Sequence, residues 1–246
     1  MKMSLVLQLA RLGDLLQTKR LLLTLAAEGE THLVVDASLA PLAALLYPGV
    51  EVHALPAHAG GLDAAGVLRL ACKACAELSA LPCDKVYNLN RSPLNLALAG
   101  LFAPEKVVGY RLENGQALAS TWACMAARWT GKRRISPLNL MDFWAFFHPS
   151  PWPADQVNPE AKAKSPSGYA GQRVGVALAG REARRSLPPP VLAETLKMVF
   201  AQYKGPTLVL LGGETEQAKA RLLLKCLPPA MQSKTENLCG KTALTD

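Results

Sequence analysis

The chain has 246 residues, which at about 150 residues per domain is enough for one large domain or two modest ones. Half of the residues are hydrophobic, 19% are charged, and Gly and Pro number 18 each, a balance that excludes a disordered chain, a collagen and a coiled coil. The 27 Lys and Arg residues outnumber the 19 Asp and Glu residues, giving a net charge of +8. This excess suits an anionic partner, which can be nucleic acid, a nucleotide-bearing substrate or an acidic membrane face.

The chain shows no sign of export or membrane insertion. No uncharged stretch reaches the roughly 18 residues that a membrane-spanning helix needs, and the N-terminus lacks the small-residue cleavage site of a signal peptide. We therefore expect a cytoplasmic protein without disulfides. Cys72 and Cys75 form a C-x-x-C sequence, but only Cys83 lies nearby and the segment has helical apolar spacing, so we expect no metal site there.

Apolar patterning predicts strands that alternate with helices. The predicted strands are 4–9, 32–36, 85–89, 105–109, 173–178 and 207–211, and the predicted helices are 15–25, 38–47, 68–81, 93–102, 190–200 and 214–226. This alternation is typical of βαβ units around a parallel sheet. A polar stretch punctuated by five prolines interrupts it, which predicts a first domain at 1–148, a linker at 149–172 and a partial second domain at 173–246.

Three predicted loops leave a strand and enter a helix, where open α/β sheets bind ligands. In the first, Gly13 allows a close backbone turn, and Asp14 is either a helix-capping carboxylate or a general base. Arg11 and Gly13 in this loop are candidate contacts to a phosphate or an acceptor.

The second loop holds Arg181, Arg184 and Arg185, which form either a solvated basic loop or a diphosphate site. In the third, Gly212 and Gly213 let a ligand approach the backbone. Glu216 there either accepts hydrogen bonds from a ribose or is an ordinary acidic residue of a first helical turn.

Five segments occur in an order that resembles family 9 glycosyltransferases, the ADP-heptose:lipopolysaccharide heptosyltransferases. They are QLARLGDLLQT at 8–18, VGYRLEN at 108–114, RSLP at 185–188, LGGETE at 211–216 and NLCGKT at 237–242. The resemblance implies the GT-B fold, two Rossmann-like domains, and inverting transfer of heptose from a nucleotide donor without a metal or cofactor.

By the same resemblance, Asp14 stands at the position of the general base and Glu216 at the position that contacts the adenosine ribose. Arg185 stands where the family usually has a lysine facing the donor diphosphate. The implied partners are ADP-heptose and a lipopolysaccharide core acceptor, with peripheral contact to the cytoplasmic membrane.

One departure from the family pattern concerns the donor site. The family's Asp-Thr-Gly-x-x-His loop, which cradles the donor phosphates, is missing from the sequence, and we expect the second domain to be truncated and this chain to be inactive. The alternatives are a nucleotide-binding module without transfer chemistry and an inactive homologue. A nucleic-acid binder is disfavoured because only 6% of residues are aromatic and no reading motif is present.

Overall fold

The computed structural model describes residues 2–58, 60–132, 134–136, 138–157, 172–178, 186–203 and 205–242. The chain divides into two compact units, Met1–Ala161 and Lys162–Asp246. Arg181, Arg184 and Arg185 lie outside the described residues. Among the residues that are described, no helix is long and apolar enough to cross a membrane.

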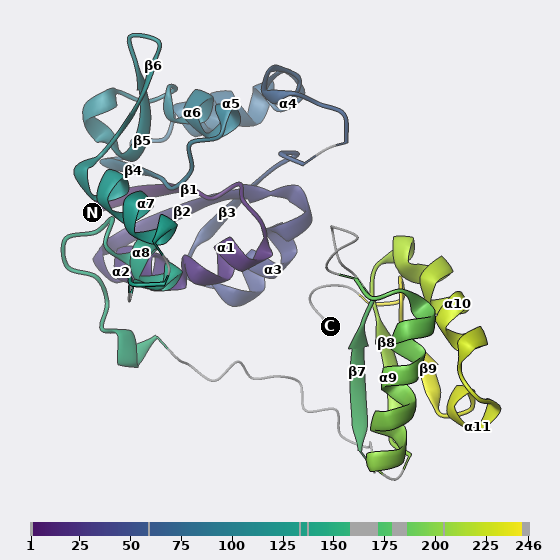
Figure 1. The fold of residues 1–246 in the computed structure, drawn as a ribbon. Helices are drawn as coiled ribbons and strands as arrows, with labels where there is room; N and C mark the ends of the chain where they lie inside the picture. Colours follow the sequence, from purple (N-terminus) through teal and green to yellow (C-terminus); the bar gives the residue numbers. More distant parts are fainter. Residues whose placement is uncertain are drawn as a thin grey trace. The chain divides into compact units, whose positions relative to one another are not determined.

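Unit 1 is built on a six-stranded sheet with the order β3-β2-β1-β4-β5-β6 (Figure 1). The strands are β1 (Lys2–Leu7), β2 (Gly29–Asp36), β3 (Glu51–Leu55), β4 (Lys85–Asn88), β5 (Val107–Glu113) and β6 (Gln116–Ala119). The first five are parallel, and β6 runs antiparallel to β5. The chain thus winds outward from β1 in one direction and then returns to its other side.

Helices cover both faces of this sheet (Figure 1). One face carries α1 (Leu12–Gln17), α2 (Lys19–Glu28), α3 (Ala40–Leu46), α7 (Thr121–Gly131) and α8 (Leu140–Ala145), and the other carries α4 (Ala64–Leu70), α5 (Cys72–Ser79) and α6 (Pro93–Ala99). Alternate β1 residues serve the two cores: Val6 packs on the α1 face, and Leu5 and Leu7 on the α4 face. Burial of both faces explains why β1 reads as a continuous apolar run.

Three expectations for unit 1 are corrected. The helix expected at 15–25 is two helices that meet at Thr18, and the one expected at 68–81 is α4 and α5 meeting at Ala71. The strand expected at 105–109 begins at Val107 and extends to Glu113. It continues into β6 because Asn114 and Gly115 both adopt positive φ, 50° and 75°, the geometry of a tight two-residue hairpin.

Unit 2 has a parallel three-stranded sheet with the order β7-β8-β9. Its strands are β7 (Arg173–Ala177), β8 (Thr207–Leu211) and β9 (Thr235–Asn237), and its helices are α9 (Pro189–Gln202), α10 (Gln217–Cys226) and α11 (Pro229–Gln232). Leu208 and Leu210 of β8 pack with Leu196 of α9 and Leu223 of α10 in one core. Within the described residues, α9 and α10 therefore lie on the same face of this sheet.

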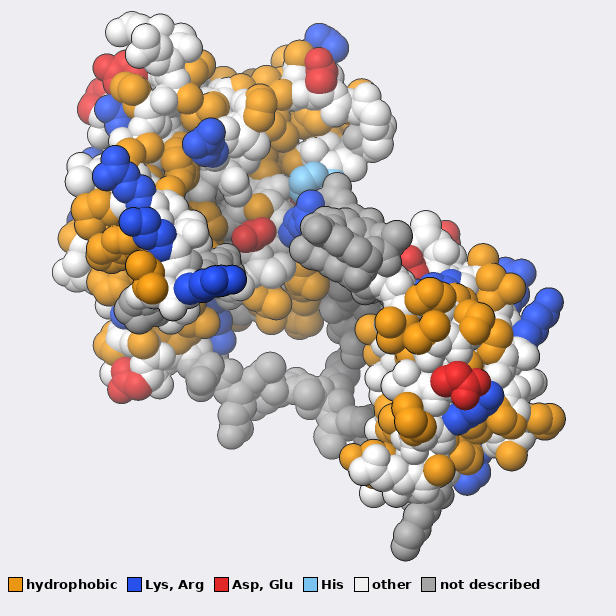
Figure 2. Space-filling model, viewed as in Figure 1, with side chains coloured by type: hydrophobic (Ala, Val, Ile, Leu, Met, Phe, Trp, Pro, Cys, Tyr) orange, Lys and Arg blue, Asp and Glu red, His pale blue; other side chains and the backbone are white. Residues whose placement is uncertain are grey.

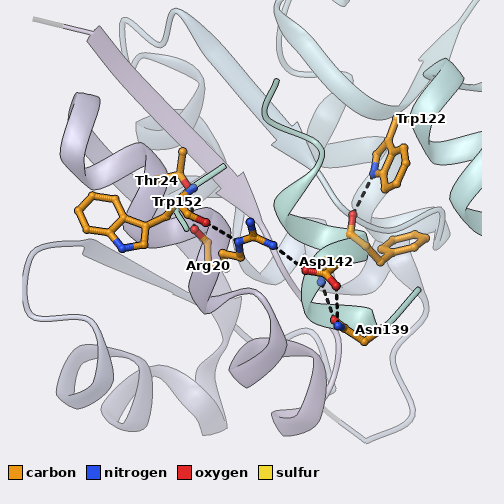
Figure 3. Close-up of polar contacts among 7 residues, drawn as sticks. Arg20, Thr24, Trp122, Asn139, Asp142 and Trp152 are labelled. Carbon is orange, nitrogen blue, oxygen red and sulfur yellow. Dashed lines mark hydrogen bonds and ion pairs between the residues drawn. The ribbon is translucent and has the colours of Figure 1, made fainter. Parts of the chain in front are cut away.

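A buried arginine ties the end of unit 1 to its beginning (Figure 3). The Arg20 guanidinium on α2 donates to Asp142 Oδ1 at 2.6 Å and to the carbonyl oxygen of Trp152, and its side chain is 9% exposed. Thr24, one turn further along α2, accepts a hydrogen bond from the Trp152 backbone N–H at 2.8 Å. Arg20 also lies 5.5 Å from the ring centroid of Phe146. These contacts fix α8 and the segment after it against α2.

Replacing this arginine should destabilise unit 1. Arg20→Met leaves the Asp142 carboxylate without its cation, so we expect the free energy of unfolding to fall by about 3 kcal/mol. Urea denaturation followed by tryptophan fluorescence measures it. The control is Lys73→Met at the exposed Lys73–Glu77 pair, which should change stability by about 0.5 kcal/mol or less. Equal effects of the two substitutions would contradict a structural role for Arg20.

Candidate functional site

The strand order of unit 1 reverses between β1 and β4, and the loops that follow these two strands diverge at the carboxyl edge of the sheet. In open α/β sheets such a reversal creates the crevice in which ligands bind. The loop after β1 leads to Asp14, and the loop after β4 carries the exposed Arg91. A cavity of about 380 Å³ opens at the same edge, lined in part by Leu9, His58 and Ser92.

Asp14 is the third residue of α1 and is half-buried. Its Oδ2 accepts a hydrogen bond from the Arg11 backbone N–H at 3.3 Å, the only hydrogen bond that its carboxylate makes with described residues. The capping contact expected of an acidic residue at a helix start is therefore present. Since a carboxylate offers about four acceptor positions, this contact leaves room to accept a hydroxyl proton.

Polar side-chain contacts fix α1, the helix that carries Asp14, to neighbouring parts of unit 1. Thr18 Oγ1 donates to the Asp14 carbonyl oxygen at 2.7 Å and accepts from Gln8 Nε2 at 2.8 Å. The Tyr47 hydroxyl donates to the Leu15 carbonyl oxygen at 3.0 Å, which anchors α1 to the end of α3. Asp14 thus stands on a rigid first turn rather than on a free loop.

The interpretation of Gly13 as a close-turn residue is corrected. Gly13 lies inside α1, its φ is not positive, and a Cβ built there meets nothing within 4 Å. The backbone therefore has no need of glycine at this position. The space around Gly13 is open and adjoins Asp14, the next residue. Arg11, which is exposed, is the N-cap residue of the same helix.

Two buried asparagines, Asn88 at the end of β4 and Asn95 on α6, join the ends of β1 and β4 and were not predicted from the sequence. Asn95 Nδ2 donates to the Leu7 carbonyl oxygen at 3.3 Å and to Asn88 Oδ1 at 3.1 Å, and Asn88 Nδ2 donates to the Tyr110 carbonyl oxygen at 2.7 Å. The network joins β1, β4 and β5 at the point of reversal. The Ser-Pro-Leu-Asn helix start at 92–95 carries no strong signal, because buried asparagine is recognised only from its partners.

Asp36 lies at the same carboxyl edge of the sheet, at the end of β2. Burial raises the pKa of its carboxyl, but hydrogen bonds from the Ser38 hydroxyl and N–H and from the His58 N–H outweigh burial and hold the pKa below its ordinary value. The carboxylate is nearly inaccessible and joins the ends of β2 and β3. We assign it a structural role.

In unit 2, the predicted loop Gly212, Gly213 and Glu216 is held by its own hydrogen bonds. Glu216 Oε2 accepts from the Gly213 N–H at 2.8 Å, and Oε1 accepts from the Thr215 hydroxyl at 3.0 Å. A Cβ on Gly212 would lie 2.8 Å from Glu216 Cβ, so this glycine is required by the packing of Glu216. The Gly240 N–H donates to the Gly212 carbonyl oxygen at 2.9 Å, which joins the loops after β8 and β9.

Lys219 is a basic residue at this edge that the sequence analysis did not single out. Its Nζ donates to the Leu178 carbonyl oxygen at 3.2 Å, at the end of β7, and to the Ser186 hydroxyl. Ser186 directly follows the segment that holds the three predicted arginines. The available signal was a lysine early in the helix that follows the glycine-rich loop. In an open parallel sheet, the start of such a helix lies near the loop after the neighbouring strand.

His32 and His53 form a pair on β2 and β3, away from the carboxyl edge of the sheet. Their Nδ1 and Nε2 atoms lie 2.9 Å apart, the ring centroids are 5.2 Å apart, and His32 Nε2 bonds Glu30 at 3.0 Å. With Glu51 they are the group of metal-type ligands found among the described residues. The two ring nitrogens lie at hydrogen-bonding distance, and His32 Nδ1 is 3.9 Å from Glu51 Oε2.

This pair should make stability depend on pH. Burial and the neighbouring His32 lower the pKa of His53 below 6.5, although Glu51 and Glu77 oppose the shift. The unfolded chain therefore binds the proton more readily, and the free energy of unfolding should fall as pH drops below about 6.5. Urea unfolding between pH 8 and pH 5 should show a flatter profile for His53→Gln than for the parent protein. His58→Gln, an exposed control, should keep the parent profile, and an unchanged profile in His53→Gln would contradict the assignment.

The fold is that of family 9 glycosyltransferases, as the resemblance in sequence predicted. The structure is similar to E. coli ADP-heptose LPS heptosyltransferase II with a TM-score of 0.65 and 18% identity, covering 99% of this chain and 74% of that one. It is similar to E. coli heptosyltransferase WaaC with ADP (TM-score 0.62, 14% identity, 99% and 76%) and to a family 9 glycosyl transferase from Veillonella parvula (0.60, 14%, 99% and 71%). No protein-family model and no curated protein sequence matches the chain. The fold is therefore α/β of the GT-B type.

Proposed function

We propose that the protein is a glycosyltransferase that moves heptose from ADP-heptose to a lipopolysaccharide core acceptor, with inversion and without a metal or cofactor. The observation that carries the proposal is the position of Asp14, on a rigid helical turn at the reversal of strand order in a fold shared with heptosyltransferases. A further support is that the neighbour WaaC was solved with ADP and with an ADP-2-deoxy-2-fluoro heptose. The proposed setting is the cytoplasmic face of the membrane.

In the proposed reaction Asp14 takes the proton from an acceptor hydroxyl as that oxygen attacks the anomeric carbon of the donor sugar. The bond between the sugar and the diphosphate breaks, and ADP leaves with the bonding electron pair. Arg185 stabilises the negative charge that develops on the diphosphate, and Glu216 orients the ribose. Arg11, Arg181 and Arg184 are further candidates for phosphate or acceptor contacts.

The second candidate function is a nucleotide-binding module without transfer chemistry. The capping hydrogen bond between Asp14 and Arg11 favours it, since that contact gives Asp14 a purely structural purpose. Substitution of Asp14 separates the two functions.

Asp14→Asn should lower turnover by about 10² to 10⁴ in the native protein and leave donor affinity nearly unchanged, because asparagine can still cap the helix but cannot accept the proton. Transfer from ADP-heptose, with ADP release as the readout, and calorimetric binding of ADP measure the two effects. Asp155→Asn, an exposed acidic residue in another short helix, is the matched control. Turnover within threefold of the parent would reduce Asp14 to a helix cap.

The donor site is tested by ADP binding. Arg185→Ala should weaken binding by roughly 1.5 to 3 kcal/mol, as expected when a charge-assisted hydrogen bond is lost, and Arg185→Lys should retain much of the affinity. Lys219→Met tests the second basic residue at this edge, and the exposed Lys225→Met, also on α10, serves as control. If Arg185→Ala binds ADP like the parent while Lys219→Met does not, the diphosphate contact belongs to Lys219.

A further inference from the structure

A stripe of exposed apolar and basic side chains runs along α7. The helix buries Ala123 and Ala126, whereas Met125 and Trp129 are 40% and 46% exposed, and Arg128 between them is exposed as well. Positions 125, 128 and 129 share one face of a helix because they are separated by three and four residues. This face points away from the core of unit 1.

The stripe continues beyond the helix onto the neighbouring segments. Ile135 is 79% exposed and Phe146, at the end of α8, is 42% exposed. With Trp129 and Lys132 they line a cavity of about 560 Å³. We call this region the α7–α8 surface, and it consists of Met125, Arg128, Trp129, Lys132, Arg134, Ile135 and Phe146. Single exposed apolar residues are ordinary, but several that gather around one hollow mark a binding surface.

The charge of the α7–α8 surface has one sign. Residues 114–141 contain four basic residues and no acidic residue. Asp142 lines the same cavity, but its carboxylate is bonded to Arg20. Figure 2 shows Lys and Arg side chains lying among hydrophobic ones over the part of unit 1 where Figure 1 places α7 and α8. The surface therefore suits an occupant that is apolar and anionic together.

We propose that the α7–α8 surface docks the protein on an anionic phospholipid bilayer. Tryptophan and phenylalanine rings enter the boundary between headgroups and acyl chains, and Arg and Lys bury their stems there while their charged ends meet lipid phosphates. Lysine is depleted in protein interfaces, and Lys132 lines the cavity at the centre of this surface, which disfavours a protein partner. A second copy of the chain would bring like charges together. The choice of a membrane rests in part on the proposed function, whose acceptor is a glycolipid.

The α7–α8 surface is built into the unit that holds the candidate base. α8 packs against α1, the helix of Asp14, and against α2 through the Arg20 contacts. Docking by this surface would therefore fix the position of the α1 turn relative to the bilayer. A glycolipid acceptor whose anchor stays in the membrane requires such a constraint, since the reacting groups must be held in register.

The test is flotation of the full chain with lipid vesicles in the absence of donor. We expect binding to vesicles of phosphatidylcholine containing about one-third phosphatidylglycerol, little binding to phosphatidylcholine alone, and weakening by salt. Lys132→Gln should reduce partitioning about fivefold, and Trp129→Ser with Ile135→Ser at least about tenfold. The matched controls Met198→Ser and Lys225→Gln, exposed on α9 and α10, should bind like the parent.

The proposal is overturned if the parent chain does not float with anionic vesicles, or if the substitutions in the α7–α8 surface bind like the parent. It is also overturned if these substitutions instead abolish a dimer seen by sedimentation, which would make the surface an interface between copies. Circular dichroism of each variant excludes loss of fold. Vesicle binding without sugar transfer would leave this proposal standing and count against the proposed function, whereas ADP binding and transfer without vesicle binding would do the reverse.

Discussion

The reversal of strand order at β1 is the constraint on which the candidate site depends. Parallel strands place every following loop at one edge, and the reversal separates the loop after β1 from the loop after β4. The buried Asn88 and Asn95 amides span that separation, because each must find partners where water is excluded. They hold the Leu7 and Tyr110 carbonyl oxygens in place. The turn that carries Asp14 thus starts from a fixed strand end.

A second long-range contact completes unit 1. Arg20 on α2 holds Asp142 and the Trp152 carbonyl oxygen, so the segment from α8 onward returns to the helix that follows the first loop. The cation is nearly buried and its net contribution to stability against an apolar pair is small, but removing either partner is costly. Its effect is therefore to specify one arrangement. That arrangement sets α8 beside α1 and leaves Trp129 and Phe146 facing outward.

Asp14 and Glu216, at the carboxyl edges of the two sheets, make the same kind of capping contact. Asp14 and Glu216 each stand in the first turn of a helix or a 3-10 turn and accept a hydrogen bond from a backbone N–H three residues earlier. Each N–H group fixes the orientation of its carboxylate, which supports a structural cap and is also what a positioned base or ribose acceptor needs. A capping hydrogen bond is compatible with a catalytic role for the same carboxylate. The turnover of the Asp14→Asn variant separates the two roles of Asp14.

The sequence by itself determined the elements that are buried on both faces or bounded by turn residues. The strands at 4–9, 32–36, 85–89, 173–178 and 207–211 were predictable because burial makes an apolar run, and the resemblance supplied the fold and Asp14. β3 and β6 were missed because each is an edge strand without a continuous buried run, although Asn114 and Gly115 marked the hairpin that leads to β6. Only the tertiary structure decided the Arg20 pair, the place of Lys219 beside Ser186 and the outward face of α7. Burial and backbone preference act locally, whereas these contacts join residues far apart in the chain and exist only once the sheet and its helices are packed.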